Sequence, residues 1–364
     1  MTQYIPENRE EVNRLKSRSS RSGIVLCAIF LSFYIALVIS MGAVKFFDSV
    51  LSGASYDIRY AVATLISIIL QYVFPLALGL VIMGINKESM FPKFVGTEYS
   101  MGKSLSYMPM AYVIPLIASL VNNVIFEFIS KYTGFKGLEN PVESAKTDTV
   151  ASTVILVILT VVIAPVFEEL IFRGVILSNL RRYGDKFAIV SSAIVFGIFH
   201  RNFHQLPYTL ALGIVLGYIT VRANSAKPAM VIHAIYNVLG ITSLYLADNE
   251  VYEKMMQPGE QYMPTTGKEV GIFILMGLQS LIIIGLVIWG LVMLIVNIVK
   301  YCKRRTKGYD ISYLSLGVLA VPEKTKYRIF FTRASMIVML VIAVYEFAQS
   351  LFPEISIINL LYGV

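Results

Sequence analysis

Blocks of apolar residues long enough to cross a bilayer recur along the whole chain. A transmembrane helix needs about 20 such residues, and nine segments approach or exceed that length in a chain of 364 residues. Only 15% of the residues are charged, whereas soluble domains carry about 25%. The sequence therefore predicts an all-α, polytopic membrane bundle with eight to nine transmembrane segments, at residues 24–44, 61–85, 105–129, 150–180, 187–200, 207–221, 228–247, 270–299 and 334–352.

Lysine and arginine residues concentrate in alternate loops, the pattern that orients membrane proteins. If the N-terminus is cytoplasmic, the cytoplasmic segments hold 22 of the 31 Lys and Arg residues and the outer segments hold 8. We therefore expect a multi-pass protein of the cell membrane with its N-terminus inside. The net charge of +8 is interpreted as topology and lipid contact, and no nucleic-acid partner is expected.

The chain contains no extramembrane loop long enough for a separate domain. Its two cysteines, Cys27 and Cys302, offer neither a disulfide framework nor a thiolate metal site. The polar N-terminal arm is interpreted as a disordered tail. Four regions are expected: a basic cytoplasmic arm at 1–23, transmembrane helices at 24–149, a core at 150–247, and C-terminal helices with a basic cytoplasmic loop (300–333) at 248–364.

The fourth segment carries three charges where each costs roughly 2.5–3.5 kcal/mol at a helix centre. Glu169 and Arg173 are four residues apart, in the order that favours an ion pair on one helix face. Glu168 is rotated by about 100° from Glu169, so its partner must come from another helix. Because this long segment contains Pro165, we expect it to tilt, to kink or to end in an interfacial turn.

Two further polar clusters contain or adjoin the three histidines of the chain. His200 ends the fifth segment, and His233 and Asn237 project from one face of the seventh. An antiparallel hairpin of the fourth and fifth segments would turn at Gly184, which is equidistant from Glu168 and His200. Those two side chains should then lie at similar depth, and we expect them to be partners. In the sixth segment, a GxxxG sequence predicts close helix packing.

A carboxylate, two imidazoles and a carboxamide facing one interior resemble a hydrolytic site. Glu168 could act as a general base that draws a proton from water, while His200 orients that water or holds a metal. His233 and Asn237 could donate hydrogen bonds to the oxyanion that forms when water attacks a carbonyl. Glu168, His200 and His233 would also suit zinc, although the sequence has no HExxH. Metal dependence therefore stays open.

Three motifs in order carry a resemblance to a known family. They are EExxxR at 168–173, FxxxH at 196–200 and HxxxN at 233–237. Together they resemble the motifs of the CPBP intramembrane proteases, the CAAX protease and bacteriocin-processing (Abi) family, which includes the type II CAAX prenyl endopeptidases. The similarity covers about residues 150–240.

The resemblance implies an intramembrane endopeptidase acting on a hydrophobic, membrane-anchored or lipidated peptide. It implies catalytic roles for Glu168, Glu169, His200, His233 and Asn237, and supporting roles for Arg173 and Phe196. Glu168 would activate water, and His233 with Asn237 would form the oxyanion or metal-side pair. The family has been described both as metalloproteases and as glutamate-dependent proteases, so a divalent metal such as zinc remains an open alternative.

Other readings of the same residues remain. One is a non-catalytic protein of this fold that gives bacteriocin immunity or scaffolds a partner, and another is a transporter, against which the lack of matched half-repeats weighs. His204 lies outside the motifs, and a capping or interfacial role is expected for it. The sequence does not indicate the oligomeric state, and the last helix carries no motif.

Overall fold

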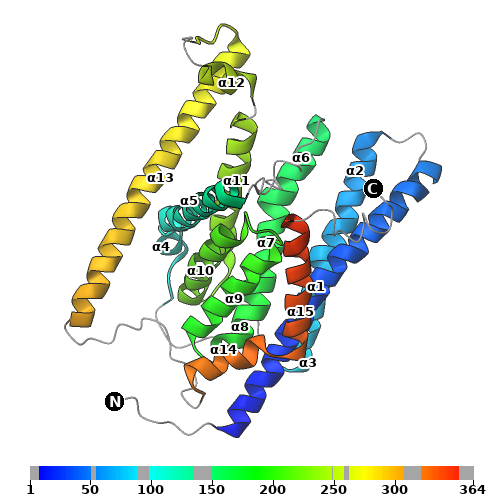
Figure 1. The fold of residues 1–364 in the computed structure, drawn as a ribbon, viewed down its shortest axis with the longest axis vertical. Coiled ribbons are helices and arrows are strands. Elements are labelled where there is room, and N and C mark those ends of the chain that lie inside the picture. Colours follow the sequence, from blue (N-terminus) through cyan, green and yellow to red (C-terminus); the bar gives the residue numbers. More distant parts are fainter. Residues whose placement is uncertain are drawn as a thin grey trace.

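Every regular element of the described residues is a helix (Figure 1), which confirms the all-α prediction. The computed structural model describes residues 8–50, 55–87, 98–133, 149–247, 249–257, 262–306 and 321–351. Its elements, with π-helical segments marked η, are α1 (Arg9–Val50), α2 (Tyr56–Ile68), η1 (Ile69–Val73), α3 (Phe74–Ile85), α4 (Met101–Leu105), α5 (Met108–Thr133), α6 (Val150–Ile158), η2 (Leu159–Ile163), α7 (Ala164–Glu169), η3 (Leu170–Leu177), α8 (Ser178–Arg181), α9 (Asp185–Phe199), α10 (Leu206–Ala223), α11 (Lys227–Ala247), α12 (Glu250–Met256), α13 (Gly267–Thr306), α14 (Glu323–Phe331) and α15 (Ala334–Leu351).

The expected count of nine spans is not confirmed. Within the described part of the chain, 6 helices are long and apolar enough to cross a membrane, and α14 with α15, bent by 67°, would make a seventh if the pair is one span. The predicted fifth span is α9, whose 15 residues reach only about 22 Å, short of a hydrocarbon core of about 30 Å. The predicted first span lies in α1, where the side chains of residues 36–44 fall outside the described residues.

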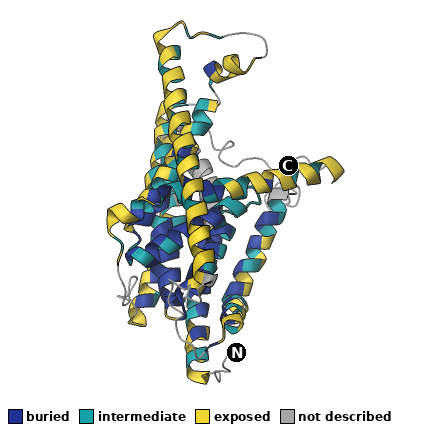
Figure 2. Ribbon diagram, turned by 90° about the vertical axis from the view of Figure 1, so that its left-hand side faces the viewer, coloured by how far each residue is buried: buried dark blue, intermediate teal, exposed yellow. Residues whose placement is uncertain are grey.

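The central helices form the protein core and the outer ones present apolar surface. In Figure 1, α9 and α10 lie between α13 on one side and α1 with α15 on the other. Buried residues gather in the central helices, whereas α13 is mostly exposed (Figure 2). The exposed side chains of α13 are largely Ile, Leu and Val, as expected of a helix that contacts lipid.

The fourth span runs without a break from Val150 to Arg181, so it does not end in an interfacial turn near Pro165, one of the three outcomes that the sequence allowed. Two π-helical segments, η2 and η3, flank the short helix α7 in this span. The Ala164 N–H bonds to the carbonyl of Leu159, five residues back. The next donor in that register would be Pro165, which has no N–H. A π turn accommodates this position without ending the helix.

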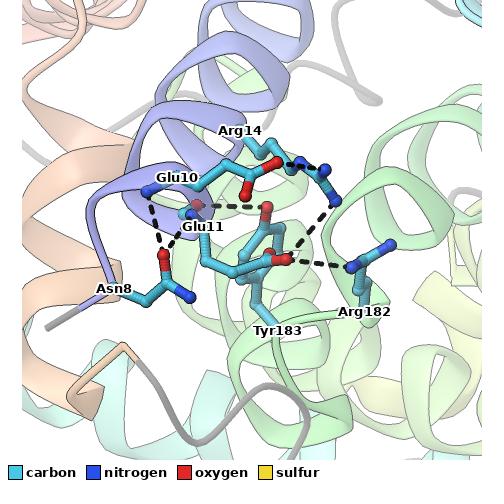
Figure 3. Close-up of polar contacts among 6 residues, drawn as sticks. All are labelled: Asn8, Glu10, Glu11, Arg14, Arg182 and Tyr183. Atoms are coloured by element: carbon cyan, nitrogen blue, oxygen red, sulfur yellow. Dashed lines mark hydrogen bonds and ion pairs between the residues drawn. The ribbon is translucent and has the colours of Figure 1, made fainter. Parts of the chain in front are cut away.

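The predicted disordered tail is wrong for residues 9–23, which are part of α1. Figure 3 shows the contacts that fix this arm to the turn after α8: Arg182 lies 3.0 Å from a carboxylate oxygen of Glu11, and the Tyr183 hydroxyl donates to the Glu11 carbonyl. Deeper along α1, Arg18 donates to the Asn179 carbonyl at 3.1 Å, and the Asn179 amide donates to the Arg18 carbonyl at 2.9 Å. The arm is therefore docked on the end of the fourth span.

The hairpin that the sequence predicted between the fourth span and α9 is present, and so is close helix packing at the GxxxG sequence. Gly184 has φ 121°, a conformation open to glycine, in the turn between α8 and α9. On the other side, α10 packs its GxxxG face on α9. A Cβ at Gly213 would lie 3.1 Å from the Cα of Ala193, and one at Gly217 would lie 3.2 Å from a methyl of Ile189.

We predict that Gly213→Val lowers the stability of the protein by about 1–3 kcal/mol, the usual cost of overpacking. The matched control is Gly277→Val in α13, where an added Cβ meets nothing within 4 Å. Thermal unfolding in detergent measures both. An equal loss of stability in the two variants would contradict close packing between α9 and α10.

Candidate active site

The three motifs meet at one cavity of about 470 Å³, which is lined by residues of η1, α5, η2, α7, α10 and α11 and by α9 with the turn that follows it. Five motif residues line it, namely Glu168, Phe196, His200, His233 and Asn237. Glu169 and Arg173 stand behind this wall, and both side chains are fully buried. The structure therefore brings together all seven motif residues that the sequence singled out. Five of them line the cavity, and Glu169 and Arg173 are buried behind these five.

Glu169 is held between Arg173 and His233. Its Oε2 lies 3.0 Å from Arg173 Nε, as the spacing of the two residues predicted. These two atoms form an ion pair, but their geometry does not meet the angle needed for a hydrogen bond. Its Oε1 lies 3.1 Å from Nδ1 of His233 on α11. With both oxygens occupied, Glu169 is a structural link between the fourth span and α11.

Glu168 faces the cavity and takes its partners from other helices. The Tyr72 hydroxyl of η1 donates to its Oε1 at 3.4 Å, and its Oε2 lies 3.9 Å from His233 Nε2. The second contact exceeds hydrogen-bond range. His200, the partner predicted from hairpin symmetry, lines the same cavity, but among the described residues it makes no hydrogen bond or ion pair with Glu168.

His200 is oriented by its own helix. Its Nδ1 lies 2.9 Å from the Phe196 carbonyl, and a carbonyl can only accept, so Nδ1 carries the proton. In the neutral imidazole, Nε2 is then the unprotonated nitrogen. The ring thus offers the cavity a hydrogen-bond acceptor.

Phe196 packs between the charged and imidazole groups. Its ring lies beneath the Arg173 guanidinium, with Cζ 4.4 Å from the ring centroid. It also meets the rings of His200 and His233 in edge-to-face contacts at 5.0 and 5.8 Å. A cation over an aromatic face is favourable, especially away from water. Phe196 therefore supports the site by contacting residues of all three motifs.

Asn237 has a structural hydrogen bond that the sequence did not reveal. Its Nδ2 donates to the Thr160 carbonyl at 2.8 Å. Thr160 lies in η2, five residues before Pro165. In the π register its carbonyl would accept from residue 165, but proline has no N–H to donate. An unpaired buried carbonyl is costly, so Asn237 stabilises the π turn that precedes the two glutamates. The amide keeps a second N–H.

Several cavity residues were missed by sequence reasoning because tyrosine and glutamine carry no charge signal. They are Tyr72, Tyr112, Gln205, Tyr208 and Tyr236. His204, for which a capping or interfacial role was expected, also lines the cavity, with its ring 6.5 Å from that of Tyr208. All three histidines therefore lie at one cavity.

The arrangement does not form a preassembled metal centre. In the part of the chain that the structure describes, no group of three His, Cys, Asp or Glu side chains is gathered closely enough to hold an ion. This includes Glu168, His200 and His233, the set that the sequence suggested for zinc. The side chains as placed do not fit a metal, and we derive no step through one.

The same stretch of chain that builds the cavity carries the family resemblance. Residues 150–239 match the family model "Type II CAAX prenyl endopeptidase Rce1-like". The match confirms the resemblance that the three motifs predicted. The Rce1-like region begins at α6 and ends within α11, so it contains every motif residue but leaves out α1, α5 and α15.

Two curated proteins resemble part of the chain. "Putative membrane peptidase YdiL" of Bacillus subtilis (strain 168) is 24% identical over 143 residues, 39% of this chain and 57% of that protein. "UPF0177 protein YxdF" of Lactococcus lactis subsp. lactis (strain IL1403) is 28% identical over 89 residues, 24% of this chain and 49% of that protein. The chain thus spans about half the length of these relatives. No solved structure matches it. The membrane-length helices indicate an integral membrane protein, and the Rce1-like match relates its residues 150–239 to a family of endopeptidases.

We predict that Arg173→Met destabilises the protein by about 3–5 kcal/mol, because the fully buried carboxylate of Glu169 loses its arginine partner and keeps only the contact with His233. Arg182→Met is the matched control, since Arg182 also pairs with a glutamate but is 47% exposed, and it should cost about 0–1 kcal/mol. Thermal unfolding of the two variants decides. Similar small losses would mean that the buried pair is incidental to folding.

A second prediction concerns Asn237 and Pro165. Asn237→Ala should cost about 1–3 kcal/mol by leaving the Thr160 carbonyl unpaired. In a Pro165→Ala background the same change should cost less, because alanine restores an N–H at the position that lacked one. A double-mutant cycle of unfolding measurements tests the coupling, and simple additivity would contradict this account of the π turn.

Proposed function

We propose that this chain is an intramembrane endopeptidase that hydrolyses a peptide bond in a hydrophobic, membrane-anchored or lipidated peptide. One observation carries the proposal. Of the two adjacent glutamates, Glu169 has both carboxylate oxygens in contact with Arg173 and His233. Glu168 instead faces a cavity that His200 also lines. A network that only held helices together would not need a carboxylate directed at a cavity.

In the proposed reaction, Glu168 acts as general base and then as general acid. It takes a proton from a water molecule as the water oxygen bonds to the carbonyl carbon of the peptide. His200 accepts a hydrogen bond at Nε2 from the same water and orients it. When the tetrahedral intermediate collapses, the C–N bond breaks and Glu168 returns the proton to the departing amine.

The oxyanion of the intermediate requires hydrogen-bond donors. His233, held at Nδ1 by Glu169, would donate from Nε2 in its protonated form. Asn237 would donate through the N–H that is not used by Thr160. In this proposal Glu169 and Arg173 act indirectly, by fixing the ring of His233, and the region 150–247 is the catalytic core.

We also propose that the N-terminus is cytoplasmic. The docked arm of α1, the α8–α9 turn and α14 lie toward one end of the bundle (Figure 1), and all three are basic in sequence. Cytoplasmic loops carry an excess of lysine and arginine, which supports this orientation. We further propose that the partners of the protein are the lipid bilayer around the bundle and a peptide substrate anchored in that bilayer.

We predict that Glu168→Gln and His200→Ala each lower kcat/KM by at least about 100-fold, the usual minimum for general acid–base groups. The assay uses the protein in liposomes with a quenched fluorogenic peptide that ends in a Cys-aliphatic-aliphatic-X sequence, with and without a prenyl group on the cysteine. Glu323→Gln, an exposed carboxylate on α14, is the control and should keep full activity.

The outcomes separate the candidate functions. Cleavage that survives both substitutions would overturn the assignment of Glu168 and His200. Binding of the probe without cleavage by the wild type would favour the non-catalytic scaffold. Activity that persists after verified metal removal by a chelator is expected from a metal-free mechanism, and loss that is restored by zinc would contradict it.

A further inference from the structure

A third buried glutamate, Glu346, lies on α15, outside the Rce1-like match. It is 5% exposed and shares the buried face of its helix with Met339 and Ala343, while Val341 and Val344 on the opposite face are exposed. An ionisable residue inside an apolar membrane helix is expensive and marks function by default. Glu346 therefore needs an explanation that the three motifs do not supply.

The charged partner of Glu346 is the residue that follows His200. Arg201 NH1 lies 3.8 Å from Glu346 Oε1, and the two side chains are 22% and 4% exposed. Arg201 has φ 60°, a left-handed conformation that costs a non-glycine residue free energy and persists only where the surroundings impose it. The ion pair thus acts at the position where α9 ends and the chain changes direction.

The next residue of α15 holds the same segment by packing. The rings of Phe347 and Phe203 lie 4.6 Å apart. Two neighbouring side chains of α15 therefore contact the segment 201–203: Glu346 through an ion pair and Phe347 through an aromatic contact. This segment lies between His200 and the next two lining residues, His204 and Gln205. A shift of residues 201–203 would therefore move the side chains that line the cavity on both sides of it.

We propose that Glu346 is a positioning residue of the candidate site. Its pair with Arg201 fixes the end of α9, and this keeps the His200 ring bonded to the Phe196 carbonyl with Nε2 available to the cavity. The proposal rests on the proposed function, because only that function gives His200 a catalytic role. The positioning itself is a property of the resting protein and is measured without substrate.

Histidine side-chain NMR gives a direct readout because the chain has 3 histidines. Protein labelled with ¹⁵N-histidine in detergent yields three pairs of imidazole signals, assigned with His204→Gln and His200→Gln. We expect Glu346→Gln to shift the His200 signals and leave those of His233, which Glu169 holds, unchanged. Glu323→Gln and Val344→Ala are controls for a lost exposed carboxylate and for a change on the exposed face of α15. Unshifted His200 signals in a folded Glu346→Gln variant would overturn the proposal.

A double variant separates positioning from simple charge compensation. Arg201→Gln or Glu346→Gln alone should lower the thermal stability, and the two together should restore part of it, because no buried charge is left unpaired. The His200 signals should stay shifted in the double variant, while Arg201→Lys, which keeps the charge, should retain the wild-type signals. Wild-type signals in the double variant would mean that the pair only neutralises charge, and would overturn the proposal.

Activity provides an independent arm. Glu346→Gln should lower kcat for the fluorogenic peptide about 10-fold or more with little change in KM, since misplacement of a catalytic group by about 1 Å can cost 100-fold. An unchanged kcat would overturn the proposal. If the wild type cleaves no probe, the proposed function fails, and the NMR result still decides whether Glu346 positions His200.

Discussion

The buried chain Arg173–Glu169–His233 is the interaction on which the site depends. Arg173 and Glu169 have no exposed side-chain surface, and neither charge would be tolerated there alone. Their pairing leaves one oxygen of Glu169 for His233, and so joins the fourth span to α11. Phe196 lies against both Arg173 and His233, which brings α9 into the same unit. Glu168 can face the cavity because its neighbour satisfies the local charge.

The sequence predicted what depends on spacing and residue type. The order Glu169 then Arg173 predicted their ion pair, the GxxxG predicted close helix packing without indicating that α9 is the partner, and the midpoint at Gly184 predicted the hairpin. What it could not predict depends on tertiary placement. Glu168 contacts Tyr72 and His233 rather than His200. The partner of Asn237 is a carbonyl, which every residue has, so no residue type could reveal it.

One of the nine predicted spans, α9, is too short to cross a bilayer, and the reason that it was counted is physical. Hydropathy records how apolar a segment is, and cannot tell burial by protein from burial by lipid. α9 is apolar because other helices cover nearly all of it, not because it crosses the bilayer unaided. Glu346, in contrast, could have been found: the rule that marked Glu168, an ionisable residue in an apolar run, applies equally to α15. It was missed because no motif drew attention to that helix.

The bond between Asn237 and Thr160 has a consequence for how the protein is made. It joins residues 77 positions apart, and α9 and α10 are synthesised between them. When the fourth span first enters the bilayer, its Glu169–Arg173 pair is already complete within one helix, but the Thr160 carbonyl and the second oxygen of Glu169 still lack their donors. Both donors arrive on the same helix, α11. Membrane insertion of α11 is therefore the step that converts a span carrying charges into an assembled site, and a nascent chain that stops before it has no means of completing one.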